Sequence, residues 1–390
     1  MNSSSSWCAG DESSCWSESS SGTRRYEPYV RRPLPTPGSG WLDGPGWLMA
    51  PMLPAAHAHG APSLSGDVPS LMPTPTPHRA PGSLDPQEDE HPSPPQPTGG
   101  APADRPRPRL ALETTLLLHG VPRHEALALH ARLAAEISAR GAEPALVGVL
   151  AGRPIVGMSG GDLAALLAHD HVPKVNTATL GLTLHRRGHG ATTVSATAEL
   201  AARAGVRVFA TGGIGGVHRE LSQRPDISAD LAALARFPVA VVASGCKSFL
   251  DPPATRELLE SLGVPVIGYR TDRFPAFYCA DGHAGVDARF DDPADLAHYL
   301  DAELSRTRRG VLVCVPPPAD SAIDPARFEG WLTQARDQTP HASGRDLTPA
   351  ILQALHRVSG GATLRTNLDL ALNNARVGAD LAVALARRGA

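Results

Sequence analysis

From residue 109 onward, the chain alternates short apolar runs with stretches in which apolar residues recur at helical spacing. The runs stop at Gly or Pro, which predicts buried strands. We expect strands within residues 109–120, 144–158, 206–213, 239–245, 264–269 and 310–317, the first leading into a glycine turn and the second holding a pair. Helices are expected within residues 124–141, 160–170, 192–205, 228–237, 253–263 and 367–388. This alternation is typical of an α/β fold, with a mainly parallel central sheet flanked by helices.

Residues 1–108 have a different character. They hold more than half of the 38 prolines and four of the five tryptophans, with many serines and no apolar period. Such a segment buries too little apolar surface to offset the entropy lost on ordering. We therefore expect a disordered Pro/Ser-rich N-terminal extension over residues 1–108 and a folded domain over residues 109–390.

The overall charge and the cysteines narrow the class of protein. The formal net charge is −3, which argues against a nucleic-acid-coating protein, because phosphate contacts need a basic surplus. No apolar run is long enough to predict a membrane span, and the first residues lack the apolar core of a signal peptide. The five cysteines show neither metal-ligand nor disulfide spacing. We expect a cytoplasmic protein, with Cys246 as a small buried residue.

Lysine is rare in this sequence. Lys and Arg together number 36, of which only Lys174 and Lys247 are lysines and 34 are arginines. Either residue can serve as a surface cation, but an amine that must lose its proton and attack carbon cannot be arginine. Lys247 follows a predicted strand, and ligands of open α/β sheets lie beyond the carboxyl ends of the strands. Lys247 is therefore a candidate nucleophile, with chance retention of two lysines as the alternative.

Two acidic positions carry candidate chemistry. Glu113 lies in the otherwise apolar stretch LETTLLLHG, where a desolvated carboxyl would be held protonated as a general acid. A solvent-facing strand residue is the alternative. The stretch DISAD places Asp226 four residues before Asp230, and a hard divalent cation would accept such oxygens, with waters completing its shell. The alternative is an Asp that caps the following helix.

Two further stretches predict ligand contacts through hydroxyl and backbone groups. GATTVSAT, residues 190–197, places Thr193 and neighbouring hydroxyls at the start of a predicted helix. Hydroxyls and free N–H groups together can bind a phosphate. Ordinary N-capping is the alternative, and it is preferred unless other residues support a phosphate site. ATGGIGGVHRE, residues 210–220, has His218 where a dinucleotide fingerprint needs its third glycine. We interpret it as a flexible backbone that approaches a polar ligand, with a plain turn as the alternative.

Taken together, these stretches resemble the pseudouridine-5′-phosphate glycosidase family. The matching segments, in family order, are LETTLLLHGVP, GATTVSAT, VFATGGIGGVHRE, DISADL, GCKSFLD, GVPVIGYRTDRFPAFYC and NNAR, and the resemblance covers roughly residues 110–388. It implies a catalytic domain that reversibly cleaves the C–C bond between uracil and ribose 5-phosphate in pseudouridine 5′-phosphate. It also implies one Mn²⁺ or similar divalent cation per subunit and a homotrimer, with neither nucleic acid nor membrane as partner.

The resemblance also assigns residues to roles. It implies Lys247 as the nucleophile that forms a Schiff base, Glu113 as the proton donor and Asp226 as the metal ligand. The positions that match the family's substrate contacts are Lys174, Val194, Ser228, Ala229 and Asp230. His218 and, among the asparagines of the last helix, Asn367 also fall where the family's site lies. A C-glycoside has no heteroatom leaving group at C1′, so one neutral amine and one movable proton suit its cleavage.

This chain departs from the family's pattern after Lys174. The family commonly has Arg-Arg-Asp where this chain has Thr177-Ala178-Thr179, so two cations and a carboxylate are missing. The departure leaves two alternatives open. One is a Schiff-base aldolase or a C-glycosidase that acts on a different sugar phosphate, and the other is a binding protein without catalytic activity. Retention of Glu113, Lys247 and Asp226 argues against the second.

Overall fold

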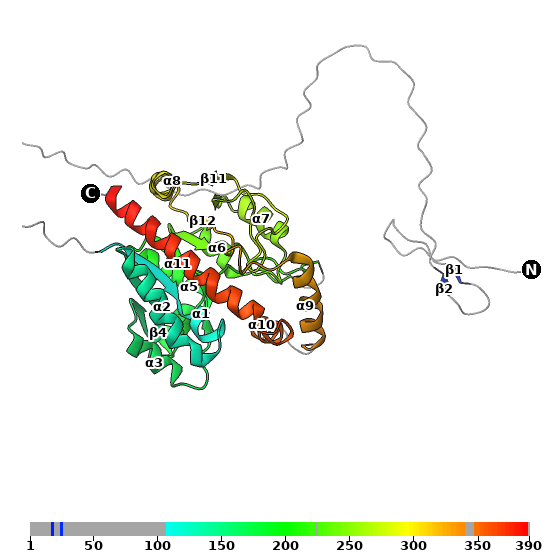
Figure 1. Ribbon diagram of the computed structural model, residues 1–390. Helices are drawn as coiled ribbons and strands as arrows, with labels where there is room; N and C mark the ends of the chain where they lie inside the picture. Colours follow the sequence, from blue (N-terminus) through cyan, green and yellow to red (C-terminus); the bar gives the residue numbers. More distant parts are fainter. Residues whose placement is uncertain (1–16, 19–23, 26–106, 223–224, 340–346, 389–390) are drawn as a thin grey trace, which may run out of the picture. The chain divides into compact units, whose positions relative to one another are not determined.

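The computed structural model describes residues 17–18, 24–25, 107–222, 225–339 and 347–388 (Figure 1). The chain divides into two units, Met1–Ser93 and Pro94–Ala390. In the first unit, the described residues form an antiparallel pair of strands, β1 (Ser17–Glu18) and β2 (Arg24–Arg25). The predicted disorder of residues 1–108 falls mainly outside the described residues, and the boundary at residue 108 stays a prediction.

The second unit is built on a sheet of eight strands, which confirms the predicted α/β fold. The strand order is β11-β10-β12-β9-β8-β3-β4-β5, and every neighbouring pair is parallel except β4 and β5. The strands are β3 (Arg109–Glu113), β4 (Glu143–Leu150), β5 (Arg153–Val156), β8 (Val208–Ala210), β9 (Ala240–Ala243), β10 (Val266–Tyr269), β11 (Ala288–Phe290) and β12 (Val311–Cys314). A separate parallel pair is formed by β6 (Lys174–Val175) and β7 (Ala191–Thr192).

Helices cover both faces of this sheet (Figure 1). The longest helix, α11 (Ala362–Arg388), packs on β3, β8 and β9 and lies between α2 (Ala126–Ala139) and α8 (Pro293–Thr307). On the other face, α5 (Val194–Arg203) contacts β3 and β4 and packs against α6 (Ala229–Leu234). The remaining helices are α1 (Thr114–His119), η1 (Arg123–Glu125), α3 (Gly160–Leu167), α4 (Thr177–His185), α7 (Pro252–Ser261), α9 (Pro325–Asp337) and α10 (Leu347–Val358).

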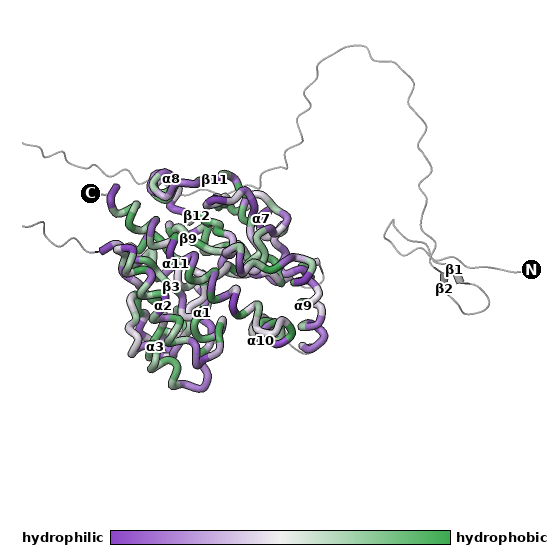
Figure 2. Tube along the Cα trace, in the orientation of Figure 1, coloured by the Kyte–Doolittle hydropathy of each residue, from purple (hydrophilic) through white to green (hydrophobic). Residues whose placement is uncertain are grey.

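The hydrophobic core follows the central strands, which are buried from both sides. All residues of β8, β9, β10 and β12 are buried, as expected for parallel strands covered by helices on both faces. Figure 2 shows the hydrophobic segments gathered at these strands and the hydrophilic ones at the periphery. In the part of the chain that the structure describes, no helix has both the length and the apolar character needed to cross a membrane.

Two expectations about the boundaries of elements were wrong. Residues 114–119 form the short helix α1 instead of continuing a strand into the turn at Gly120. Leu116, Leu117 and Leu118 are all buried, and such an apolar run has no period that separates strand from helix. The last helix begins at Ala362, five residues before its predicted start at Asn367, with Gly360 and Gly361 at positive φ just before it.

Candidate active site

The carboxyl ends of β3, β8 and β9 meet at a cavity that has two connected parts. We call the part of about 40 Å³ the inner compartment and the part of about 280 Å³ the outer compartment. Lys174 and Lys247 line both parts, so the two compartments join at these side chains. The inner compartment is lined by Glu113, Thr115, Leu116, His119, Gly120, Lys174, Thr211, Gly212, Gly213, Lys247, Phe277, Leu352 and Asn367.

Glu113, the last residue of β3, lies in the inner compartment with only 7% of its surface exposed. Burial raises the pKa of its carboxyl from 4.5 to about 7, although Lys247 and a hydrogen bond from Thr211 both act to lower that pKa. The Thr211 hydroxyl donates this bond to Oε1 of Glu113. The predicted desolvation of Glu113 is thus confirmed, and the alternative of a solvent-facing strand residue was wrong.

Lys247 lies in the turn that follows β9. Its backbone N–H donates to the carbonyl of Ile214 at 3.1 Å, and its carbonyl accepts from Leu250 at 2.9 Å. Gly245 makes the turn possible, because its φ is +63° and a Cβ there would lie 1.7 Å from the carbonyl oxygen of Pro275. The neighbouring Cys246 is fully buried with its pKa raised to about 12, which confirms the expectation of a buried residue.

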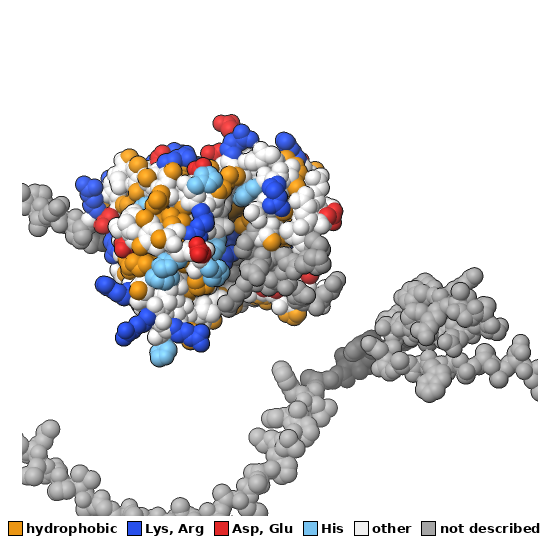
Figure 3. Space-filling model, turned by 90° about the horizontal axis from the view of Figure 1, so that it is seen from below, with side chains coloured by type: hydrophobic (Ala, Val, Ile, Leu, Met, Phe, Trp, Pro, Cys, Tyr) orange, Lys and Arg blue, Asp and Glu red, His pale blue; other side chains and the backbone are white. Residues whose placement is uncertain are grey.

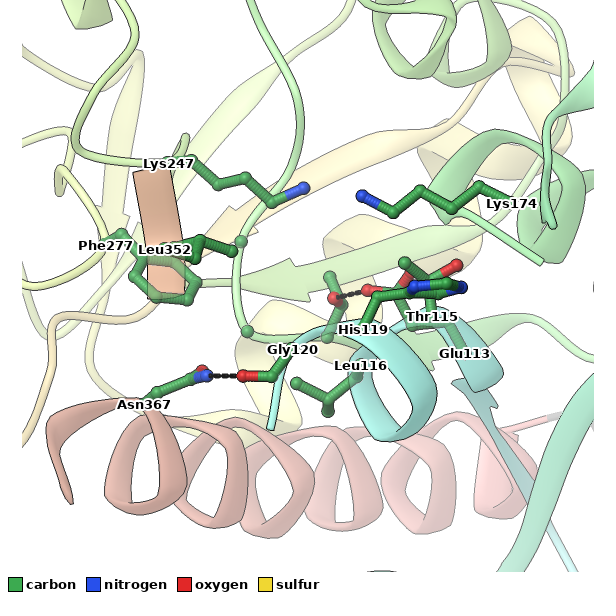
Figure 4. A pocket seen from close by; sticks show the side chains of 13 residues that line it. Glu113, Thr115, Leu116, His119, Gly120, Lys174, Lys247, Phe277, Leu352 and Asn367 are labelled. Atoms are coloured by element: carbon green, nitrogen blue, oxygen red, sulfur yellow. Dashed lines mark hydrogen bonds between the residues drawn. The ribbon is translucent and has the colours of Figure 1, made fainter. Parts of the chain in front are cut away.

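Lys174 comes from the opposite side of the cavity, at the start of β6. Figure 4 shows the side chains of Lys174 and Lys247 extending toward each other above Glu113. Both amines act on the pKa of the Glu113 carboxyl, which places their charges near it. The only two lysines of the sequence therefore face one another at the junction of the compartments.

Asn367 and His119 form another wall of the inner compartment. Asn367 is 2% exposed and its Nδ2 donates to the carbonyl of Gly120 at 2.8 Å, while its buried Oδ1 accepts no hydrogen bond from the described residues (Figure 4). Burial and the charge of Lys174 lower the pKa of His119 to about 4. A neutral His119 then donates from Nε2 to the carbonyl of Val172 at 3.0 Å.

The outer compartment is lined mainly by polar residues and by the beginnings of helices. Its lining is Lys174, Asn176, Thr193, Gly215, Gly216, His218, Asp226, Ser228, Lys247, Phe249 and Leu250. Asn176, Thr193 and Ser228 are the N-cap residues of α4, α5 and α6. The N–H groups of a first helical turn lack intrahelical partners and favour negative charge. Side chains already accept from the first turns of α4 and α6, whereas Thr193 makes no cap bond, so the start of α5 is the one best suited to an anion.

The hydroxyls of residues 190–197 are used differently from one another. Thr192 is buried and donates to the carbonyl of Val147 at 2.7 Å, and Thr197 donates to Thr192 at 2.9 Å. Ser195 is also fully buried. Of the hydroxyl residues in this stretch, Thr193 lines the outer compartment, and it makes no side-chain cap bond to its helix. Of the phosphate contacts predicted in this stretch, the Thr193 hydroxyl and the backbone at the start of α5 therefore remain.

Asp230 is a buried residue that holds two backbone segments next to the outer compartment. Its carboxylate oxygens accept from the backbone N–H groups of Ser195 and Gly215, each at 2.9 Å, and the residue is 5% exposed. Gly215 belongs to a tightly packed loop, since a Cβ there would lie 2.2 Å from the Ser228 hydroxyl. The expected flexibility of this glycine stretch was wrong for that reason. Ala229 is the first residue of α6, next to Asp230.

The other predicted contact residues lie at this compartment in different ways. Val194 is the first residue of α5 and is 1% exposed, so a ligand could meet its backbone N–H group but hardly its side chain. Asp226 and His218 face each other with 3.6 Å between Oδ2 and Nε2. The side chain of Ser228, not that of Asp226, caps α6 by accepting from the Asp230 N–H. The capping alternative for Asp226 was therefore wrong.

Asp226 is the carboxylate at which a divalent cation was predicted. Among the described residues, no three His, Cys, Asp or Glu side chains gather into a metal-binding group. The Asp226 side chain is 41% exposed and lies in a compartment rich in oxygen donors. A cation with one carboxylate ligand, and otherwise waters and ligand oxygens, fits this arrangement and is typical of Mg²⁺-like ions.

His119, Phe277 and Leu352 line the inner compartment but were missed as candidate residues. Phe277 adopts a φ of +52° and donates its N–H to the Ser244 carbonyl at 2.8 Å. Its ring fills the space where a Cβ on Gly213 would lie, 2.4 Å from Cδ2. No pattern in the sequence signals such a position. His119 could have been found, because it ends the same apolar stretch that contains Glu113.

Comparisons with known proteins show which proteins this chain is similar to. Residues 101–384 match the family described as indigoidine synthase A like protein. The chain is 42% identical to a pseudouridine-5′-phosphate glycosidase of Salinispora tropica, covering 73% of this chain and 89% of that protein. It is 44% identical to another of that name from Symbiobacterium thermophilum, covering 72% of this chain and 94% of that protein.

Solved structures give the same relationship. An indigoidine synthase A-like protein of Thermotoga maritima is 32% identical with a TM-score of 0.67, over 71% of this chain and 92% of that one. The prealnumycin C-glycosynthase AlnA, solved with ribulose 5-phosphate, is 34% identical with a TM-score of 0.67, over 73% and 93%. The chain belongs to the indigoidine synthase A-like family.

Proposed function

We infer that this protein is a pseudouridine-5′-phosphate glycosidase, which cleaves its substrate reversibly into uracil and ribose 5-phosphate. The single observation that carries the inference is the position of Lys247 and Glu113. They meet where a small compartment closed by apolar side chains joins a larger polar one. A flat base suits the inner compartment and a sugar phosphate suits the outer one. The relatives that carry this name support the assignment.

The residues provide each group that the reaction needs. The neutral amine of Lys247 bonds to C1′ as the C1′–O4′ bond breaks, and O4′ takes up the proton that the amine nitrogen gives up. Glu113, whose raised pKa of about 7 leaves it partly protonated near neutral pH, gives its proton to C5 of the base. The C1′–C5 bond then breaks as the C1′=N iminium forms on Lys247. Water adds to the iminium, and ribose 5-phosphate leaves with the amine restored.

The remaining residues bind and orient the substrate in this proposal. The base would lie against Phe277, with the buried Oδ1 of Asn367 accepting an N–H of uracil. The phosphate would lie among Lys174, Thr193 and the backbone N–H of Val194 at the start of α5. Asp230 would act through the backbone groups that it holds, since a carboxylate beside a phosphate would repel it.

A Mn²⁺ or similar ion is part of the proposal, with Asp226 as its protein ligand. When bound, it would supply positive charge for the substrate's oxygens. Asp226 and His218 would orient this end of the substrate. A homotrimer and a cytoplasmic location also stay predictions, and light scattering of the purified protein would test the first.

The proposal is tested by incubating the protein with pseudouridine 5′-phosphate and Mn²⁺ and detecting uracil and ribose 5-phosphate. Borohydride added together with ribose 5-phosphate should reduce the iminium and leave a sugar adduct on Lys247. A protein that releases no uracil, or an adduct that maps to Lys174, would contradict the assigned roles.

A second candidate function is C-glycoside cleavage or Schiff-base chemistry on a different sugar phosphate. The observation that favours it is at α4, whose first turn is Thr177-Ala178-Thr179 in place of Arg-Arg-Asp. Here Asn176 and Thr179 bond reciprocally as a capping box, and Asn176 lines the outer compartment. A panel of pentose and hexose phosphates with uracil, measured by coupling rate, separates the two candidates.

A further inference from the structure

Asn374 of α11 ties together two ends of strands beneath the inner compartment. It is fully buried, and its Nδ2 lies 2.8 Å from the Thr211 carbonyl, 3.3 Å from the Gly212 carbonyl and 3.2 Å from Oγ of Ser244. Thr211 and Gly212 follow β8, whereas Ser244 follows β9. One amide from a helix thus reaches both strands at the edge where the site is built.

The first of these ends carries the partner of the acid. Thr211 donates its hydroxyl to Glu113, and the same residue's carbonyl accepts from Asn374. The main chain of Thr211 is also held by its N–H, which donates to the Val242 carbonyl at 3.0 Å. Thr211 is therefore fixed from both sides, so the direction of its hydroxyl toward Glu113 depends on the Asn374 bond.

The second end carries the nucleophile. Ser244 precedes Lys247 by three residues and is separated from it by the constrained Gly245. The Ser244 N–H donates to the Gly212 carbonyl at 2.9 Å, and its carbonyl accepts from Phe277. A shift of Ser244 would therefore move both the Lys247 turn and the wall that Phe277 forms.

We propose that Asn374 is a positioning residue that holds the acid and the nucleophile in register, by bonding the ends of β8 and β9 at once. The role of the two groups that it aligns rests on the proposed function. Asn374 is not among the described residues that line the inner compartment, so it would act through its bonds to Thr211 and Ser244. A purely space-filling role would not require an amide at this fully buried position, because an apolar side chain of similar size would serve.

The test compares neighbouring asparagines of the same helix. Asn374→Leu removes the donor with little change in size, and Asn374→Ser keeps a donor on a shorter side chain. Asn373→Leu is the matched control, since within the described part of the chain its Nδ2 reaches only the Pro316 carbonyl, at 3.5 Å. In the full-length protein, we would follow the Glu113 carboxyl by infrared titration, with Glu113→Gln as the blank, and the rate of borohydride trapping of ribose 5-phosphate on Lys247.

Asn374→Leu should raise the pKa of Glu113, because the Thr211 bond that favours the carboxylate weakens. The charged groups that also act on this carboxyl are Lys247, Lys174 and Asp230, and the substitution replaces none of them. A Lys247 amine that moves away from Glu113 would change the pKa in the same direction, because that amine lowers it. Trapping on Lys247 should slow at least tenfold. Asn374→Ser should lie between the parent and Asn374→Leu, and Asn373→Leu should match the parent in both measurements.

A folded Asn374→Leu protein with the parent's Glu113 titration and trapping rate would overturn the proposal and leave Asn374 as core packing. If that variant does not fold, Asn374→Ser is the test. The parent's pKa of Glu113 and the parent's trapping rate in Asn374→Ser would then overturn the proposal. Failure of the proposed function would look different. In that case the parent protein would release no uracil. The infrared titration would still measure the pKa of Glu113 in Asn374→Leu and in Asn373→Leu, so the positioning role of Asn374 could be tested separately.

Discussion

The inner and outer compartments share two lysines but are built in opposite ways. The inner one holds about 40 Å³ and is closed by Leu116, Phe277 and Leu352, so its single carboxyl is desolvated. The outer one holds about 280 Å³ and presents Asn176, Thr193 and the first turns of helices. The difference teaches that one cavity can keep a proton on an acid at one end and bind an anion at the other.

One face of the molecule shows how the charged side chains are distributed over its surface. On the face that Figure 3 shows, lysine and arginine side chains are scattered among acidic, histidine and hydrophobic ones and do not gather into one basic patch.

The largest effect is expected where the compartments join. Lys247→Arg keeps the positive charge but cannot present a neutral amine, so turnover should fall at least about a thousandfold, or roughly 4 kcal/mol in the barrier. Lys174→Arg is the matched control, because a lysine that only binds the substrate's charge is replaced in part by arginine. Uracil release measures both. Lys247→Arg retaining a tenth of the parent rate would show that Lys247 belongs to binding only.

A smaller loss is expected from the outer compartment. Asp226→Ala should lower turnover on the order of a hundredfold, since charge stabilisation in the site is lost, and excess Mn²⁺ should restore it in part at most. Glu220→Ala, which removes a surface carboxylate paired with Arg336, should have no effect. An unchanged rate for Asp226→Ala in the presence of a chelator would remove metal from the mechanism.

The inner compartment should set the pH dependence. Glu113 donates a proton, and its pKa is about 7, so cleavage should fall about tenfold per pH unit once the pH exceeds that value. Glu113→Gln should be slow at every pH and lose this limb of the profile. The pH dependence of uracil release under saturating substrate measures it. A parent profile that stays flat to pH 9 would assign the proton to another group.

The smallest expected effect concerns the wall between the inner compartment and a further hollow of about 560 Å³, which Leu352 and His119 also line. Leu352→Ala should lower coupling of uracil to ribose 5-phosphate by about tenfold, because packing on the base is lost. It should also raise the use of two-ring carbon nucleophiles relative to uracil. Phe277→Ala is the comparison, since its constrained backbone makes that wall rigid. Equal selectivity in the parent and Leu352→Ala would mean that the base does not contact this wall.

Much of this arrangement could be predicted from the sequence, because it depends on local pattern. The strands before Thr211, Ser244 and Glu113 are apolar runs that end at glycine or at a lone acid, and parallel strands bring such ends together. The rarity of lysine drew attention to the two amines that the structure places face to face.

The rest depends on contacts between distant segments, which local pattern does not record. The carboxylate of Asp230 bonds to backbone groups 35 and 15 residues away, so it braces the site where a substrate contact was expected. Phe277 and Leu352 become walls only because distant segments of the chain fold around the inner compartment. The short helix α1 formed where a strand was predicted, because three successive leucines are all buried and such a run fits either element.

The burial of Glu113 has a consequence for the stability of the folded protein. Its carboxyl binds a proton more tightly in the folded chain, with a pKa of about 7, than at its ordinary value of 4.5. The folded state therefore holds more protons than the unfolded state between these values, and the free energy of unfolding should decrease as pH rises through this window, by about 3 kcal/mol. The contribution of Glu113 alone therefore makes the folded protein less stable in alkaline than in mildly acidic solution.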